Sequence, residues 1–132
     1  MSVFVDTSAL LAVLDADDRN HKSARETWKD LISRDELLVC TNYVLIETFA
    51  LVQHRLGMSA VRTFQDDICP VLIVEWVDES THRAGVTGVL TALRKNLSLV
   101  DCVSFVVMRR LGIKSAFVFD PHFKEQGFSC IP

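Results

Sequence analysis

The sequence predicts an α/β fold: three layers, α/β/α, with a mostly parallel central sheet of four to five strands. Short apolar runs without polar alternation, typical of parallel strands covered on both faces, recur at residues 3–5, 37–40, 71–76 and 116–119. Segments with helical spacing of apolar residues separate these runs, which is the alternation of a βαβ chain. At 132 residues the chain is expected to form a single domain, residues 1–132.

Helices are expected between the strands wherever a capping residue precedes an apolar face. They span residues 8–14, a segment after Asn20, residues 43 to about 56, residues 59 to 66 or 67, residues 78 or 80 to about 95, and residues 102–111. Gly57 and Gly112 are expected to end two of these helices. Ser98 and Asp101 have the spacing of a capping box. A short edge strand at 129–131 closes the chain.

Composition narrows the possible functions. The chain carries 14 basic and 17 acidic residues, a net charge of −3, which taken alone argues against a nucleic-acid partner. If four acids surrounded metal ions, however, 14 basic residues would remain against 13 acidic ones. Since no apolar run approaches the roughly 18 residues of a membrane span, we expect a cytoplasmic protein with no membrane partner. Four cysteines without a Cys-x-x-Cys pair are expected to be buried, reduced thiols: Cys40, Cys69, Cys102 and Cys130.

Four acidic residues fall where this topology brings strand ends and helix starts to one edge of the sheet. Asp6 and Asp120 directly follow apolar strands, and Glu47 and Asp101 lie near the starts of two helices. Carboxylates gathered in one place repel one another and acquire raised pKa values unless cations neutralise them. Hard divalent ions prefer such oxygen ligands. The sequence therefore predicts a site for Mg²⁺ or Mn²⁺.

Each acid also has a simpler explanation as a local hydrogen-bonding or ion-pairing residue. Asp6 suits the N-cap of the helix that follows it, and Asp101 suits the capping box. Glu47 can pair with Arg55 or Arg109. The fourth acid precedes a proline and suits a turn. We favour the shared metal site because all four acids converge on one edge.

Four segments carry short motifs that include these acids. They are Val5-Asp6-Thr7-Ser8-Ala9-Leu10-Leu11, Asn42-Tyr43-Val44-Leu45-Ile46-Glu47, Leu97-Ser98-Leu99-Val100-Asp101, and Phe119-Asp120-Pro121-His122-Phe123 with Gly127-Phe128. In this order they resemble the PIN-domain family, specifically its small stand-alone VapC-type toxins, across the whole chain. The resemblance implies a parallel sheet with helices on both faces, Mg²⁺- or Mn²⁺-dependent endonuclease activity on RNA, and inhibition by a cognate antitoxin.

By position, the resemblance implies that the catalytic and metal-binding residues are Asp6, Glu47, Asp101 and Asp120. We expect Asp6 and Asp101 to hold the tighter ion and to lie outside the core. The ion activates a water that attacks the phosphodiester, leaving a 5′-phosphate and a 3′-hydroxyl. His122 stands where many relatives have an acid or an amide. The sequence therefore does not decide whether a second metal ion binds. It could donate a proton to the leaving oxygen, but we interpret it as an incidental surface residue.

Other residues are expected to support the reaction. Ser8 matches a small polar position whose hydroxyl can bond an acid or a metal-bound water. The resemblance implies an RNA substrate, which we expect to be a tRNA, rRNA or mRNA. The candidates for phosphate contacts are Arg19, Lys22, Arg109, Arg110 and Lys114.

Two other function classes fit the sequence less well. A phosphatase of the haloacid-dehalogenase kind needs a second Asp two residues after the first, where this chain has Ser8. A non-catalytic acidic-pocket module with a PIN-like fold, or a phospho-receiver, is the other class. A receiver needs a lysine near its last strand, and Lys114 precedes that strand instead of following it.

Hydrophobicity suggests protein partners. Apolar residues make up 49% of the chain and the mean hydropathy is +0.25. Residues 43–68 hold more apolar side chains than one helix face needs, namely Phe49, Val52, Leu56, Met58, Val61 and Phe64. We expect part of this surface to form a homodimer and a neighbouring groove to accept an amphipathic antitoxin segment, which could direct a basic side chain toward the acids.

Overall fold

A parallel sheet of five strands forms the centre of the computed structural model, which describes residues 1–92 and 96–132. Its strand order is β3-β2-β1-β4-β5, and every pairing is parallel. The strands are β1 (Ser2–Val5), β2 (Leu37–Thr41), β3 (Leu72–Glu75), β4 (Ser115–Phe117) and β5 (Ser129–Ile131). The predicted three-layer fold is confirmed, and the edge strand at 129–131 is present.

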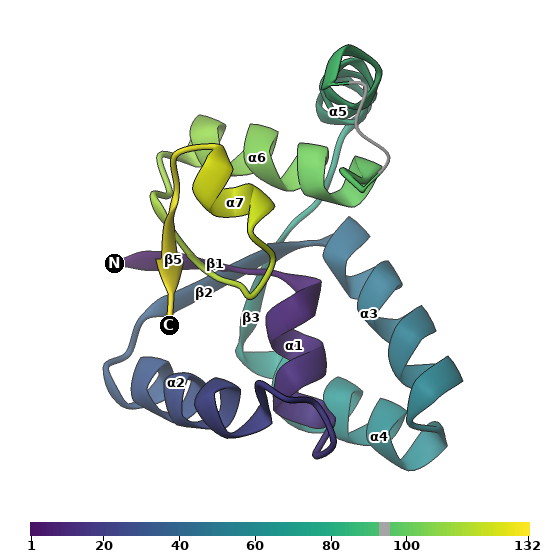
Figure 1. Ribbon diagram of the computed structural model, residues 1–132, viewed down its shortest axis with the longest axis vertical. Helices are drawn as coiled ribbons and strands as arrows, with labels where there is room; N and C mark the ends of the chain where they lie inside the picture. The colour runs from purple at the N-terminus through teal and green to yellow at the C-terminus, as the bar shows by residue number, and fades with distance from the viewer. Residues whose placement is uncertain (93–95) are drawn as a thin grey trace.

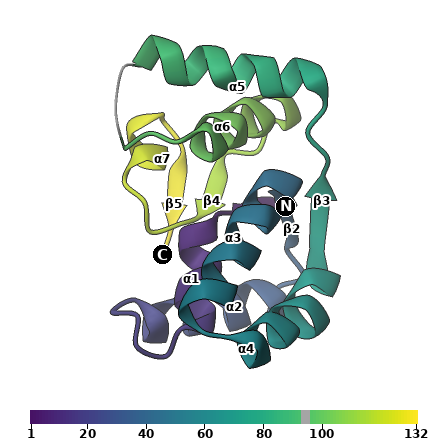
Figure 2. The ribbon, with the colours of Figure 1, turned by 90° about the vertical axis from the view of Figure 1, so that its right-hand side faces the viewer.

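Helices cover both faces of this sheet (Figure 1). One face carries α1 (Thr7–Leu14), α2 (His21–Ser33), α3 (Asn42–Arg55) and α4 (Met58–Thr63). The other carries α6 (Leu99–Leu111) and α7 (His122–Glu125), with α5 (Glu79–Ala92) packed on the outer side of α6 (Figure 2). A π-helical turn (Phe64–Ile68) and a 3₁₀ turn (Cys69–Val71) lead from α4 into β3. The predicted end of α5 near residue 95 lies outside the described residues.

The centre of the core is β1, because it is paired on both sides and covered on both faces. Phe4 and Val5 are fully buried, and the Phe4 ring lies 6.3 Å from that of Phe123 on α7. Phe117 on the neighbouring β4 is also fully buried. Burying one such side chain contributes roughly 1.5–3 kcal/mol relative to leaving it exposed. This explains why β1 shows no polar alternation: neither face meets water.

Helix starts, helix caps and strand ends depart from the predictions in several places. Gly57, not Ser59, precedes α4, and Ser59 lies within its first turn. Asn20 precedes α2 as predicted, but its side chain makes no capping hydrogen bond. The strand expected to end at Phe119 ends at Phe117, because the Phe119 N–H donates to a side chain, that of Ser8 (3.0 Å), and so leaves the sheet.

Helix α6 is held firmly by α5. A Cβ atom added at Gly85 of α5 would lie 2.4 Å from Cγ2 of the buried Val103 on α6, so glycine is required for this close approach. Gly112 ends α6 in the left-handed conformation with φ +69°, as predicted. The helix that carries Asp101 is therefore rigidly placed.

The apolar surplus on α3, α4 and the π-helical turn is smaller than predicted. Of the six side chains expected to be in excess, Val52 and Phe64 are buried and three are half-buried, while Met58 is 51% exposed. All four cysteines are free thiols, with Cys40 and Cys102 buried and the other two half-buried. Within the described part of the chain, the helices are too short or too polar to cross a membrane.

Candidate active site

Three of the four predicted acids lie close together where the strand order reverses. The chain runs outward from β1 through β2 to β3, then returns to place β4 and β5 on the other side of β1. In open α/β sheets, ligands bind at such a switch point, outside the carboxyl ends of the strands. Asp6 follows β1 there, Asp120 lies on the loop after β4, and Asp101 lies in the first turn of α6 above them.

Asp6 is both a helix cap and a buried acid. Its Oδ2 accepts hydrogen bonds from the Ser8 N–H (3.1 Å) and the Ser8 hydroxyl (2.7 Å). With 3% of its surface exposed, Asp6 belongs to the core, contrary to our prediction. Burial raises its pKa to about 7; the Ser8 bonds oppose the rise, and the charges of Asp101 and Asp120 add to it. Capping therefore does not remove the cost of ionising this carboxyl group.

Ser8 joins the two loops of the switch point. Its hydroxyl donates to Asp6 and accepts a hydrogen bond from the Phe119 N–H (3.0 Å). The backbone beside it is fixed in the same way, since the Asp6 N–H donates to the Phe117 carbonyl (3.1 Å). One small side chain thus sets the position of Asp6 relative to the loop that carries Asp120.

Asp101 completes the capping box that the sequence predicted. Its Oδ2 accepts from the Ser98 N–H (3.2 Å), and its own N–H donates to the Ser98 hydroxyl (3.1 Å). Asp101 is also buried, at 7% exposure, again contrary to our prediction. Burial raises its pKa, and the nearby Asp120 and Glu47 add to the rise, although the Ser98 bonds oppose it.

His122 is buried, at 5% exposure, and our interpretation of it as a surface residue is wrong. The next residue, Phe123, packs against Phe105 (4.9 Å between ring centroids) and Phe4, which draws α7 and the imidazole into the protein. The Asp120 Oδ1 accepts the His122 N–H (2.8 Å). The imidazole Nδ1 lies 2.7 Å from the same oxygen, yet in a direction that gives no hydrogen bond.

Asp101, Asp120 and His122 form a group of possible metal ligands among the described residues. Each offers a ligand atom, and these atoms all lie within 4.8 Å of one another. Ligands of one ion at about 2.1 Å from it stand up to about 4.2 Å apart, so small side-chain adjustments suffice. Two carboxylates beside a buried nitrogen without a hydrogen bond suit a divalent cation.

Glu47 lies at the rim of this site. It is half-buried and has no hydrogen bond or ion pair among the described residues. The predicted pairing with Arg109 is not formed, because that guanidinium donates to Gln126 (2.8 Å). Glu47 lines an open pocket of about 420 Å³ together with Tyr43, Ile46 and Val100. Its carboxylate is therefore available for a ligand from solution.

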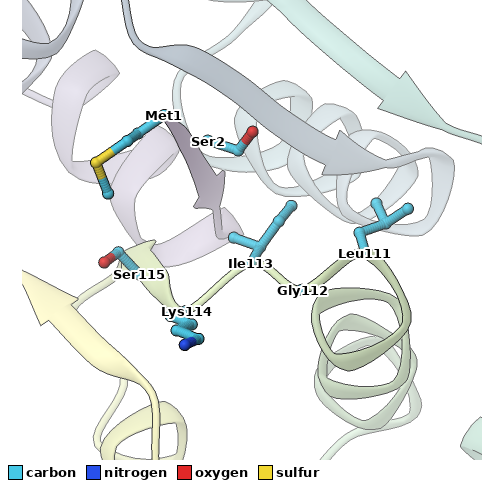
Figure 3. A pocket seen from close by; sticks show the side chains of 7 residues that line it. All are labelled: Met1, Ser2, Leu111, Gly112, Ile113, Lys114 and Ser115. Carbon is cyan, nitrogen blue, oxygen red and sulfur yellow. The ribbon is translucent and has the colours of Figure 1, made fainter.

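The basic residues named as RNA contacts are not brought to the acids. Arg109 and Arg110 lie in the last turn of α6, whose first turn holds Asp101. Lys114 precedes β4 and lines a pocket with Met1 and Ser2 at the amino ends of the strands (Figure 3). Arg19 lies on the loop after α1, and Lys22 lies in the first turn of α2. The length of α1 therefore separates both from Asp6.

Comparison with known proteins identifies the family of this chain. Residues 3–129 match the PIN domain. The 23S rRNA-specific endonuclease VapC20 of Mycobacterium tuberculosis is 33% identical over 127 residues, covering 96% of this chain and 95% of the relative. The crystal structure of that protein, described as a sarcin–ricin loop cleaving toxin, superimposes with a TM-score of 0.85 at 32% identity over 96% of both chains.

A more distant structure shares the fold alone. FitAcB from Neisseria gonorrhoeae has a TM-score of 0.71 at 12% identity, covering 98% of this chain and 96% of its own. A PIN-domain match over nearly the whole length and a relative 33% identical over 96% of the chain settle the assignment. The chain belongs to the PIN-domain family.

Proposed function

We propose that this protein is a metal-dependent endoribonuclease and the toxin of a toxin–antitoxin pair. The observation that carries the proposal is the group of buried acids and one buried imidazole at the switch point of the sheet. Nuclease activity of the VapC20 relative supports the reaction class. A haloacid-dehalogenase-type phosphatase is not supported, since the whole fold is that of a PIN domain.

The sequence favoured Asp6 and Asp101 as the tighter ligands; we now assign the ion to Asp101 and Asp120, whose ligand atoms lie within 4.8 Å of each other. Asp6 and Glu47 would complete the site directly or through water. A Mg²⁺ or Mn²⁺ ion bound there would polarise the scissile phosphate and activate a water for attack. Ser98 holds Asp101 in place through the capping box, and Ser8 holds Asp6. Both carboxylates are therefore positioned before substrate arrives, which lowers the reorganisation that the reaction requires.

Ribosomal RNA is the substrate class that we propose. VapC20 is named for cleavage of 23S rRNA and of the sarcin–ricin loop, and it matches this chain over nearly its full length. Phosphates beyond the cut site could reach Arg19 and Lys22, which are exposed. The cytoplasm, where ribosomes act, is the corresponding location.

A cognate antitoxin and a second copy of the chain are the proposed protein partners. Ile46 is 65% exposed beside Glu47, so an apolar segment bound at this rim would cover the approach to the acids. Exposed apolar side chains such as Met58 support the homodimer. Light scattering at tens of micromolar tests it, and a monomer would refute the dimer without affecting the nuclease proposal.

The activity is tested with purified protein and a transcript that contains the sarcin–ricin loop, compared with intact ribosomes. We expect cleavage in millimolar Mn²⁺ or Mg²⁺, none in EDTA, and fragments with 5′-phosphate and 3′-hydroxyl ends. Cleavage that persists in EDTA, or fragments with 2′,3′-cyclic phosphates, would refute the metal-activated water. Cleavage of other RNAs but not of this loop would refute only the choice of substrate.

A further inference from the structure

We propose that His122 is itself a metal ligand through Nδ1, and that this nitrogen makes the site prefer Mn²⁺ and other transition ions over Mg²⁺. The inference rests on the proposed metal-dependent function and adds the identity of the ion. It starts from one observation: the Nδ1 atom is buried and has no hydrogen-bond partner. Buried polar atoms are nearly always bonded, so an unpartnered one requires an explanation.

The position of the nitrogen supports a ligand role. An imidazole nitrogen of His122 lies within 4.8 Å of ligand oxygens from both Asp101 and Asp120, and Nδ1 is the nitrogen that contacts Asp120. It lies 2.7 Å from the Asp120 Oδ1, which also accepts the His122 backbone N–H, but this contact lacks hydrogen-bond geometry. An ion placed among the three side chains would satisfy the nitrogen and both carboxylates together.

The backbone of α7 also holds the imidazole in place. Phe123 is fully buried against Phe4 and Phe105, so the helix turn that carries His122 is anchored in the core. The His122 side chain itself is 5% exposed. Its nitrogen is therefore held beside the carboxylates, as a preorganised ligand is.

Ligand chemistry then sets the choice of ion. Carboxylates and water suit Mg²⁺ and Mn²⁺ alike, whereas imidazole suits transition ions and is a poor ligand for Mg²⁺. A site built from oxygen alone would discriminate weakly between the two ions. Replacing one oxygen ligand by the His122 nitrogen shifts the preference toward Mn²⁺.

Pulsed electron paramagnetic resonance of bound Mn²⁺ tests the contact directly, because a coordinated imidazole produces ¹⁴N modulation in the echo decay. We expect this modulation in the wild type and in His54→Asn, a control in which an exposed histidine of α3 is replaced. We expect its loss in His122→Asn and in His122→Asp, with circular dichroism confirming that each variant is folded.

Calorimetric titration with each ion supplies the second measurement. His122→Asn should lower the Mn²⁺ affinity roughly tenfold or more while changing the Mg²⁺ affinity by less than about threefold. Bound Mn²⁺ without ¹⁴N modulation in the wild type would mean that His122 lies beside Asp120 without coordinating the ion. That result would overturn this inference while leaving the proposed nuclease intact. Failure of the wild type to bind Mn²⁺ at all would overturn both.

Discussion

Both edges of the sheet are hollowed, but among the described residues the almost fully buried carboxyl groups lie at the carboxyl edge. At that edge, Asp6 and Asp101 are almost fully buried, and Glu47 lines a pocket of about 420 Å³. At the amino edge, a pocket of about 220 Å³ lies between Met1 and the turn from α6 into β4 (Figure 3). Among its described lining residues, the one ionisable side chain, Lys114, is exposed.

The difference teaches which kind of observation identifies a site. A surface pocket can arise wherever helix ends pack imperfectly, and it lowers the stability of the fold only slightly. A buried carboxylate with a raised pKa lowers the stability of the fold at neutral pH. Such groups are found mainly at functional sites. The contrast between the two edges can therefore be tested by asking whether they respond differently to substitution.

The largest expected difference is in RNA cleavage. Asp101→Asn should lower the cleavage rate by roughly 100-fold or more, because a metal ligand supplies several kcal/mol of transition-state stabilisation. The amide keeps an oxygen for the Ser98 N–H, so the helix cap should survive. Lys114→Gln, the matched change at the amino edge, should alter the rate by about twofold at most. Equal losses in the two variants, measured on the same transcript, would remove the distinction between the edges.

The next test is the pH dependence of stability without metal. The Asp6 pKa is raised to about 7 in the folded protein from an ordinary value of 3.8. As pH rises, Asp6 loses its proton at a lower pH in the unfolded chain than in the folded protein. The stability that protonated Asp6 contributes to the fold is therefore fully present below about pH 4 and is lost as pH rises through 7. The full loss corresponds to about 4 kcal/mol at most.

Urea unfolding in EDTA from pH 4 to pH 8 measures this loss. The wild type should become less stable as pH rises, and Asp6→Asn should show a flatter profile and exceed the wild type at pH 8. Asp66→Asn, which removes an exposed acid, controls for the change in net charge. A profile flattened equally by both substitutions would attribute the effect to net charge and not to burial at the carboxyl edge.

A smaller effect tests how firmly α6 holds Asp101 at that edge. A Cβ at Gly85 would overlap Val103, two residues beyond Asp101, whereas one at Gly88 would lie 3.4 Å from Cys102, an ordinary contact. Gly85→Ala should cost about 1–3 kcal/mol of unfolding free energy, since the new methyl group would overlap the fully buried Val103. Gly88→Ala should be neutral or stabilising by up to about 1 kcal/mol. Similar values for both in urea titrations would contradict the close packing of α5 on α6.

Much of the fold was predictable because local patterns and topology agree. Unbroken apolar runs indicated parallel strands, and the Ser98–Asp101 spacing predicted the capping box that the structure shows. Once a parallel sheet was assumed, the acids after β1 and β4 had to lie at one edge. The position of Lys114 at the opposite edge could have been inferred in the same way, since it directly precedes a strand.

What the sequence could not show depends on packing between distant residues. Asp120-Pro121-His122 has the composition of an exposed turn, and the burial of His122 arises from Phe123 packing on Phe4 and Phe105. Likewise, the burial of Asp6 requires β4 and α1 to close around it. Local pattern assigns residue types to elements, but it does not say how deep a polar side chain lies.

Thermal unfolding at pH 8 in EDTA and in millimolar Mn²⁺, on the wild type and on Asp101→Asn, tests the central claim most directly. That claim is that the acids at the carboxyl edge form one metal site. An ion that binds only the folded state stabilises it by about 2.7 kcal/mol at a concentration 100 times its Kd, which raises the Tm by several degrees. We predict such a rise for the wild type and little or none for Asp101→Asn. An equal rise in both proteins, or none in the wild type at saturating Mn²⁺, would contradict the account.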